Sequence, residues 1–164
     1  MTRTITAVLA VLALAVAVAI GPAAAAPAQQ RNIVQTAAAS GQFDTLAMLL
    51  SKAGLVKTLN QKGPFTVFAP TDAAFAKVPK ATLNGLLANK AKLRAVLLYH
   101  VVAGTVTAAQ VGKLSSAETA SGKSVRIRVA GSNVFVNRSK VTKVDVMASN
   151  GVIHVLDRVL IPPR

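Results

Sequence analysis

The stretch GPFTVFAPTDAAF, residues 63–75, contains a strand, its end and the start of a helix. Residues 65–69 are mostly β-branched or aromatic with apolar side chains on both faces, which predicts a strand buried on both sides. Pro70 has no amide hydrogen to donate and ends the strand. Thr71 and Asp72 carry oxygens that accept from the free amides of a following helical turn. The Asp72 carboxylate is therefore either a helix cap or a binding group, and the frequency of capping Asp residues favours the cap.

The first thirty residues have the layout of a secretory signal peptide. A short basic start at Met1–Thr4 precedes an uncharged apolar run over residues 5–20, and Gly21-Pro22 leads into an Ala-rich segment. The run is shorter than the ~20 residues of a typical membrane span, so an uncleaved anchor is the less favoured alternative. We expect a signal peptide over residues 1–28, with cleavage near residues 26–28, and one domain over residues 29–164. The product would be periplasmic or extracellular.

Charge and cysteine content restrict the classes of function. The chain has 19 Lys and Arg residues against 5 acidic ones, and loss of Arg3 with the leader would leave 18 against 5, a net charge of +13. Such a surface favours anionic partners such as polysaccharides, lipid headgroups or nucleic acid. Export and the presence of only one Tyr and five Phe disfavour nucleic acid. With no cysteine, disulfides, thiol catalysis and Cys-bound metal are excluded.

The N-terminal half of the domain is helical in pattern. Capping residues and apolar periodicity predict short helices, which we place at residues 33–39 after Asn32, 44–53 before Gly54, 55–59, 79–87, 90–98 after Asn89, and 108–111 after Thr107. The C-terminal half has the alternation of strands, which we place at residues 99–102, 124–129, 133–136, 141–147 and 152–160. We therefore predict an α+β fold of two packed layers, with N-terminal helices on a sheet completed by antiparallel C-terminal strands.

Gly131-Ser132 is typical of a two-residue hairpin loop and sets the register of the strands beside it. In this register Arg128 faces Phe135, while Ile127 and the valines, Val129 among them, share the core face. Phe135 is thereby directed outward, beside Arg128 and near Arg126.

Three segments resemble the fasciclin domain family in order and spacing. They are TVFAPTDAAF (residues 66–75), LLYHVVAG (97–104) and NGVIHVLDRVLIPP (150–163). The resemblance covers about residues 29–163 and implies helices packed on a β-wedge or sandwich in an extracellular, non-enzymatic protein that acts in cell adhesion. In vertebrate members an Asp-Ile pair and the Tyr-His region have been proposed to contact integrins. By this resemblance Tyr99, His100 and Asp145, which is followed here by valine, are candidate binding residues.

No pattern in the chain predicts catalysis, a metal site or a cofactor. His100 has no nucleophile or orienting group near it in sequence, so a buried, hydrogen-bonded histidine is favoured over a catalytic one. A zinc site from His100 and His154 would need a third ligand from only five acidic residues. We assign Thr71, Asp72 and His154 structural roles.

The basic residues of the C-terminal strands are the strongest candidates for binding: Arg126, Arg128, Arg138, Lys140 and Lys143. An outward Phe135 between guanidinium groups would bind a polyanion or stack on a sugar. A solvated face whose Phe packs under the arginine side chains is the equal alternative. Lys90, Lys92 and Arg94 are expected to be only solvated.

The sequence thus predicts a secreted, non-enzymatic adhesion or matrix-type module that contacts anionic surface polymers or proteins. The alternative is a carrier of an apolar small molecule such as a carotenoid or lipid, suggested by Phe65, Phe68 and Phe75 around the first motif. Hydrolase activity is a third hypothesis, which serves only for comparison with these two.

Overall fold

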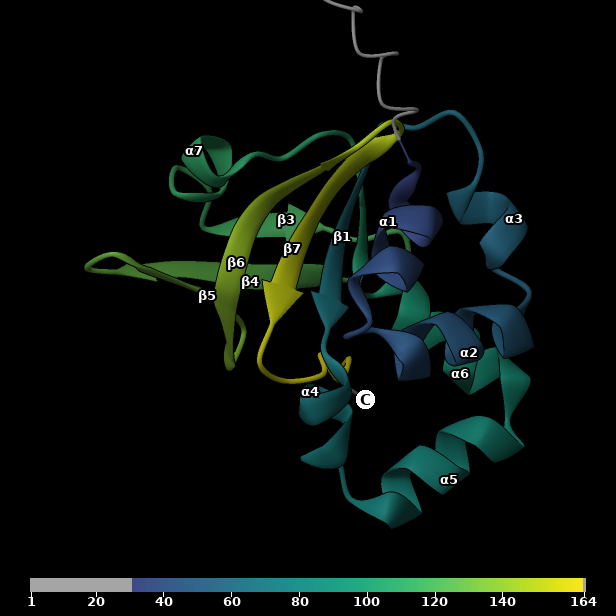
Figure 1. The fold of residues 1–164 in the computed structure, drawn as a ribbon. Coiled ribbons are helices and arrows are strands. Elements are labelled where there is room, and N and C mark those ends of the chain that lie inside the picture. Colours follow the sequence, from purple (N-terminus) through teal and green to yellow (C-terminus); the bar gives the residue numbers. More distant parts are fainter. Residues whose placement is uncertain (1–30, 164) are drawn as a thin grey trace, which may run out of the picture.

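The computed structural model describes residues 31–163, and Figure 1 shows most of the helices on one side of a strongly twisted set of strands, with α7 on the other side. The helices are α1 (Ile33–Ser40), α2 (Asp44–Ala53), α3 (Val56–Leu59), α4 (Asp72–Ala76), α5 (Lys80–Ala88), α6 (Lys90–Leu98) and α7 (Ala108–Val111). The strands are β1 (Phe65–Pro70), β2 (Val101–Ala103), β3 (Ser116–Glu118), β4 (Ser124–Ala130), β5 (Asn133–Val136), β6 (Ser139–Ala148) and β7 (Gly151–Leu156). The predicted signal peptide lies outside these residues.

The sheet places the first and the last sequence motif side by side. Its strand order is β2-β1-β7-β6-β5-β4-β3. β1 pairs parallel with β7, with Phe65 opposite Gly151 and Pro70 opposite Leu156, and antiparallel with β2. The remaining neighbours are antiparallel, so the predicted α+β fold is confirmed.

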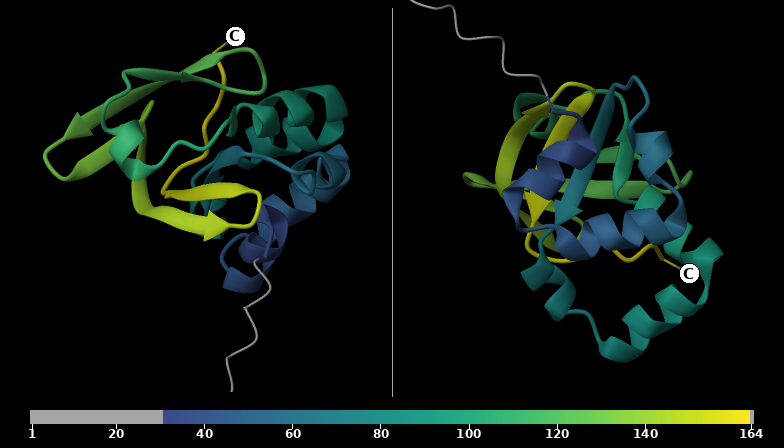
Figure 2. Two further views of the ribbon diagram at one scale, coloured as in Figure 1. Left: turned by 90° about the horizontal axis from the view of Figure 1, so that it is seen from above. Right: turned by 45° about the vertical axis from the view of Figure 1, so that its right-hand side comes forward.

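The strands β1 and β7 separate two hydrophobic clusters. On the helical side Val67 and Ile153 pack with buried residues of α1, α2 and α6. On the other side Phe68 and Leu156 pack against Val125 and neighbouring residues of β4 and β5. In Figure 1, β3 and β4 cross behind β1 and β7 in a different direction, and the view from above in Figure 2 shows the hairpin strands as a separate layer, so the sheet folds over as a wedge. This wedge agrees with the arrangement that the family resemblance implies, and it adds a layer to the two that the helix and strand patterns predicted.

Local capping signals account for most helix ends. Asn32 forms a capping box with Gln35 at the start of α1, and Asn89 Oδ1 accepts from the amide of Lys92 in α6. Gly54 ends α2 in the left-handed conformation, where a residue with a Cβ atom is disfavoured. These predictions are confirmed.

Three predictions about strands need correction. The strand expected from Tyr99 begins at Val101, because Tyr99 still belongs to the last turn of α6. The last strand ends at Leu156 instead of residue 160, because the next residue, Asp157, forms hydrogen bonds with Lys140. The hairpin register is confirmed, but Val129 is 45% exposed, because the end of the β4–β5 hairpin projects beyond the core (Figure 1).

Within residues 31–163, none of the helices has the length and apolar character needed to cross a bilayer.

Candidate functional site

The first motif positions Thr71 and Asp72 where β1 passes into α4. Thr71 Oγ1 accepts from the amide of Ala74 (3.2 Å) and caps α4. The Asp72 carboxylate instead reaches α2, where it accepts from the amides of Thr45 (2.8 Å) and Asp44 (3.3 Å). Because α2 has no side-chain cap at its own N-cap position, Asp72 supplies the missing acceptor from another part of the chain.

The charge of Asp72 is stabilised by the same contacts. Partial burial raises the pKa of the Asp72 carboxyl, but hydrogen bonds from Thr45 and Asp44 outweigh this effect and hold the pKa below its usual value. The carboxylate is therefore charged at neutral pH, beside the positive end of the α2 dipole. This arrangement favours the helix-cap interpretation of Asp72 over that of a binding group.

Replacing Asp72 with alanine is expected to lower the free energy of unfolding by about 1–2 kcal/mol, because two amides of α2 lose their acceptor. Urea unfolding at neutral pH measures this change. Since the folded-state pKa is lowered, the contribution is present above the ordinary carboxyl pKa of 3.8 and declines as the pH falls below it. Asp44→Ala is the matched control: it removes the same charge from the same helix end and should cost only about 0.3–1 kcal/mol. Equal losses in the two variants would contradict the cap.

The Tyr-His motif lies in the interior: Tyr99 is 1% and His100 2% exposed. Tyr99 Oη donates to the carbonyl of Ser124 (3.2 Å) and accepts from Asn137 Nδ2 (3.0 Å). Side chains buried to this extent do not reach a partner at the surface. The structure therefore does not support direct contacts by Tyr99 and His100.

Both ring nitrogens of His100 bond to the backbone. Nδ1 lies 2.7 Å from the carbonyl of Val96, and Nε2 accepts from the amide of Leu160 (2.9 Å). Only a neutral ring with its proton on Nδ1 satisfies both contacts. Burial lowers the pKa of His100 to about 4, although the bond to Val96 raises it. The predicted alternative of a buried, hydrogen-bonded histidine fits this geometry.

Hydrogen bonds join Asp145 to the start of α7 and His154 to the segment just before this helix. His154 is buried and stacks on Phe68 at 5.6 Å between ring centroids, and its Nε2 donates to the carbonyl of Val106 (2.7 Å). His154 Nδ1 accepts from the amide of Asp145 (3.4 Å), where β6 bulges and Asp145 has φ 54°. The exposed Asp145 carboxylate accepts from the amide of Ala108, the first residue of α7 (2.8 Å). The acidic group that the resemblance assigns to partner contact is thus engaged with a helix start.

The two histidines do not share a site. Each ring uses both nitrogens on groups of the chain. In the part of the chain that the structure describes, no group of three or more His, Cys, Asp or Glu side chains is placed to hold a metal ion.

The phenylalanines of the first motif belong to the core. Phe75 is in the helical-side cluster, with Phe65 packed against it, and Phe68 is in the cluster on the opposite side of the sheet. Close packing therefore accounts for the apolar character that suggested a carrier of apolar ligands.

A row of basic and aromatic residues crosses three strands on the outer face of the hairpin. Arg128 of β4 is paired with Phe135 of β5, which is paired with Lys140 of β6. The Arg128 guanidinium carbon lies 5.3 Å from the centre of the half-buried Phe135 ring, within the range of a cation–π contact. We call Arg128, Phe135 and Lys140 the cross-strand row. The contact is compatible with both predicted interpretations, a binding face and a ring packed under an arginine.

The other predicted basic residues separate into two places. Arg126 and Arg138 line a hollow of 610 Å³ together with Arg158, which no sequence pattern indicated as a binding residue. Lys143 is exposed and lies opposite Val155 of β7, away from this hollow. Arg158 follows β7 within the last motif, and only the folded chain shows that it lies near the β5–β6 turn.

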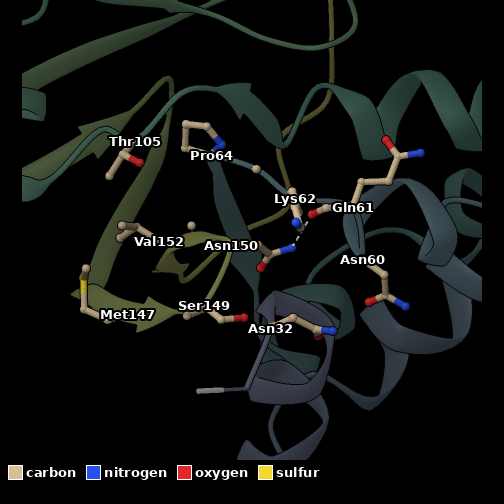
Figure 3. Close-up of a pocket in the computed structure, with 13 residues that line it drawn as sticks. Asn32, Asn60, Gln61, Lys62, Pro64, Thr105, Met147, Ser149, Asn150 and Val152 are labelled. Carbon is tan, nitrogen blue, oxygen red and sulfur yellow. Dashed lines mark hydrogen bonds between the residues drawn. The ribbon is translucent and has the colours of Figure 1, made fainter. Parts of the chain in front are cut away.

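A second hollow, of 530 Å³, lies where β1 and β7 begin, and Figure 3 shows Asn150 at its centre. The Asn150 side chain donates to the carbonyls of Leu59 (2.6 Å) and Gln61 (3.1 Å) and accepts from the amide of Ile33 (2.9 Å). The amide of Phe65 donates to the Asn150 carbonyl (3.0 Å). Asn150 thereby ties the ends of α1, α3, β1 and β7 together, which indicates a structural role.

These features correspond to a known domain type: the fasciclin domain family model matches residues 41–162. The chain belongs to the fasciclin domain family. Protein sll1483 of Synechocystis sp. is 49% identical over 135 residues, which cover 80% of this chain and 73% of that protein. Immunogenic protein MPB70 of Mycobacterium bovis is 36% identical over 148 residues, 87% of this chain and 75% of that protein.

Animal fasciclin proteins share the domain within longer chains. The pig transforming growth factor-beta-induced protein ig-h3 is 38% identical over 74% of this chain, but the match covers only 18% of that protein. The solved structure of a FAS1 domain pair from the insect cell adhesion molecule fasciclin I has a TM-score of 0.65 at 19% identity and covers 80% of this chain and 51% of that one. This likeness confirms the predicted fold.

Proposed function

We propose that this fasciclin domain is an exported adhesion module that binds acidic surface polysaccharide through the outer face of β4, β5 and β6. The observation that carries the proposal is the cross-strand row, in which an aromatic ring lies between an arginine and a lysine. A sugar ring stacked on Phe135 would place its acidic groups beside two cations.

The overall charge supports this choice of partner. The chain carries 19 basic side chains against 5 acidic ones. Among the acidic ones, Asp72, Asp145 and Asp157 accept hydrogen bonds from backbone amides. Most basic groups therefore have no carboxylate partner available, which favours attraction of a polyanion. The predicted leader and the family membership support an extracytoplasmic site of action.

A heparin column tests the proposal, since heparin is a soluble acidic polysaccharide. Arg128→Ala/Lys140→Ala is expected to elute at clearly lower salt than wild type, because two contacts to the polymer and their counterion release are lost. Both side chains are exposed, so the fold should be retained.

The matched control is Lys90→Ala/Arg94→Ala on α6, which removes the same charge from two other exposed residues. We expect its elution to change much less. Equal shifts in the two variants would show that only net charge matters, and an unchanged elution of Arg128→Ala/Lys140→Ala would refute the face named here.

A further inference from the structure

The hollow beside the Tyr-His motif concentrates positive charge. It measures 610 Å³, within the range of small-molecule sites, and its lining includes Arg126, Arg138 and Arg158 from three separate segments. Leu160, Ile161 and Pro163 form an apolar wall, and Ile161 is 55% exposed. No carboxylate is among the described residues that line it. Three cations in one concave site, with no carboxylate among the described lining residues, favour an anion.

Hydrogen bonds fix the β4 side of this hollow. The backbone of Arg126 is held by Asn137, whose Oδ1 accepts from the Arg126 amide (2.9 Å) and whose own amide donates to the Arg126 carbonyl (2.7 Å). Asn137 Nδ2 in turn donates to the buried hydroxyl of Tyr99 (3.0 Å). The buried Tyr99 thus holds Asn137, which in turn holds the backbone of Arg126 at the hollow. The tyrosine therefore positions a lining residue without contacting a ligand itself.

The wall formed by the segment after β7 is fixed in the same way. The amide of Lys140 donates to Asp157 Oδ1 (2.8 Å), and the amide of Asp157 donates to the carbonyl of Lys140 (3.1 Å). These two bonds hold Arg158 next to the segment that carries Arg138. The amide of Leu160 donates to His100 Nε2 (2.9 Å). Backbone positions fixed before binding reduce the entropy lost when a ligand is held.

We propose that this hollow binds one acidic sugar unit, with its carboxylate or sulfate group on the three arginines and its ring against the apolar wall. The inference rests on the proposed function, which it deepens by naming a site separate from the cross-strand row. Guanidinium groups bind both oxyanions through paired hydrogen bonds. An apolar wall of three residues matches a sugar ring better than a lipid chain. Among the described lining residues Tyr99 is the only aromatic one, and it is buried, so these residues offer no exposed ring for a nucleobase to stack on.

Calorimetric titration of the purified protein with defined oligosaccharides tests the site. The probes are an oligogalacturonate tetrasaccharide, which carries only carboxylates, a sulfated galactan tetrasaccharide, which carries only sulfates, and neutral maltotetraose. We expect one or both acidic probes to bind with at least one site per chain and maltotetraose not to bind; the arginine variants below assign this binding to the hollow. Which of the two acidic probes binds shows whether the hollow accepts a carboxylate or a sulfate group. Equal affinity for maltotetraose, or no binding of either acidic probe, would overturn the site.

Charge-preserving variants separate a specific site from general attraction. Arg138→Lys/Arg158→Lys keeps the net charge but removes the paired hydrogen bonds, so the affinity should fall about tenfold or more. Lys90→Ala/Arg94→Ala, which lowers the net charge elsewhere, should change it about twofold or less. Wild-type affinity in Arg138→Lys/Arg158→Lys would overturn the inference.

The two proposals fail in different ways. A wild-type protein that is retained by heparin but binds neither acidic tetrasaccharide refutes the hollow and leaves the cross-strand row. Arg128→Ala/Lys140→Ala that elutes like wild type, with tetrasaccharide binding intact, refutes the row and leaves the hollow.

Discussion

Replacing Gly151 with alanine is expected to lower the free energy of unfolding by about 3 kcal/mol or more, through a clash that the backbone cannot relieve. A Cβ atom at this position would lie 1.8 Å from the carbonyl oxygen of Phe65 and 2.9 Å from Ile33 Cδ1. Gly151 and Phe65 are directly opposite in the parallel β1–β7 pair, so relief of the clash would separate the two central strands. Urea or thermal unfolding measures the change.

The close approach of the chain segments at the start of β1 and β7 predicts a similar result for Gly63. A Cβ atom on Gly63 would lie 2.0 Å from the carbonyl oxygen of Asn150, the group that accepts from the amide of Phe65. Gly63→Ala should therefore also destabilise the protein strongly, since an alanine would displace the backbone that starts β1.

Gly85→Ala provides the control. Gly85 lies in α5, where an added Cβ atom meets nothing within 4 Å, and alanine favours a helix over glycine by about 1 kcal/mol. This variant should be as stable as wild type or more stable. Failure of Gly151→Ala to fold under conditions where Gly85→Ala folds would count as the expected result. Wild-type stability of Gly151→Ala would show that the close approach of the two strands is not required.

Local chemistry made much of the fold predictable from the sequence. Asn32, Asn89 and Thr71 cap the helices that follow them, because the capping group and the amides lie within three residues. The register of the β4–β5 hairpin also follows from its two-residue loop, which is why Arg128 and Phe135 were correctly paired. The helix and strand patterns predicted the α+β class, and the motifs of the family added the β-wedge.

Features that depend on distant parts of the chain were not predictable in this way. The carboxylate of Asp72 caps α2, about thirty residues earlier, whereas the sequence shows only that Asp72 lies at the start of its own helix. The parallel pairing of β1 with β7 brings together segments separated by about eighty residues. The hollow brings together Arg126, Arg138 and Arg158 from three segments. The first two are predicted as binding residues because they lie near the C-terminal strands, but no local pattern points to Arg158.

The stability of the protein should fall as the pH is lowered from about 6.5 to 4, and His100 is the group we expect to cause much of the loss. Protonation of the buried ring would place a proton on Nε2, which now accepts from the amide of Leu160. The bond would be lost and a charge would be buried in the interior, where His100 is almost fully shielded from solvent.

The sign and size of the His100 contribution to stability follow from the pKa values of this residue in the folded and unfolded states. In the folded protein burial lowers the pKa of His100 from 6.5 to about 4, whereas the unfolded chain keeps the ordinary value. Between these values the unfolded state binds the proton more tightly, so the contribution is complete above about pH 6.5 and is lost as the pH falls towards 4. A difference of this size corresponds to about 3 kcal/mol at most.

Comparison with His100→Gln isolates this contribution, since every other ionisable group is the same in both proteins. At neutral pH the variant should be less stable than wild type by about 1–3 kcal/mol, because the bonds to Val96 and Leu160 are impaired. Glutamine has no proton to gain, so urea unfolding across this pH range should show the difference between the two proteins shrinking as the pH falls. A constant difference would mean that His100 does not titrate differently in the folded and unfolded states, and that other groups cause the acid sensitivity.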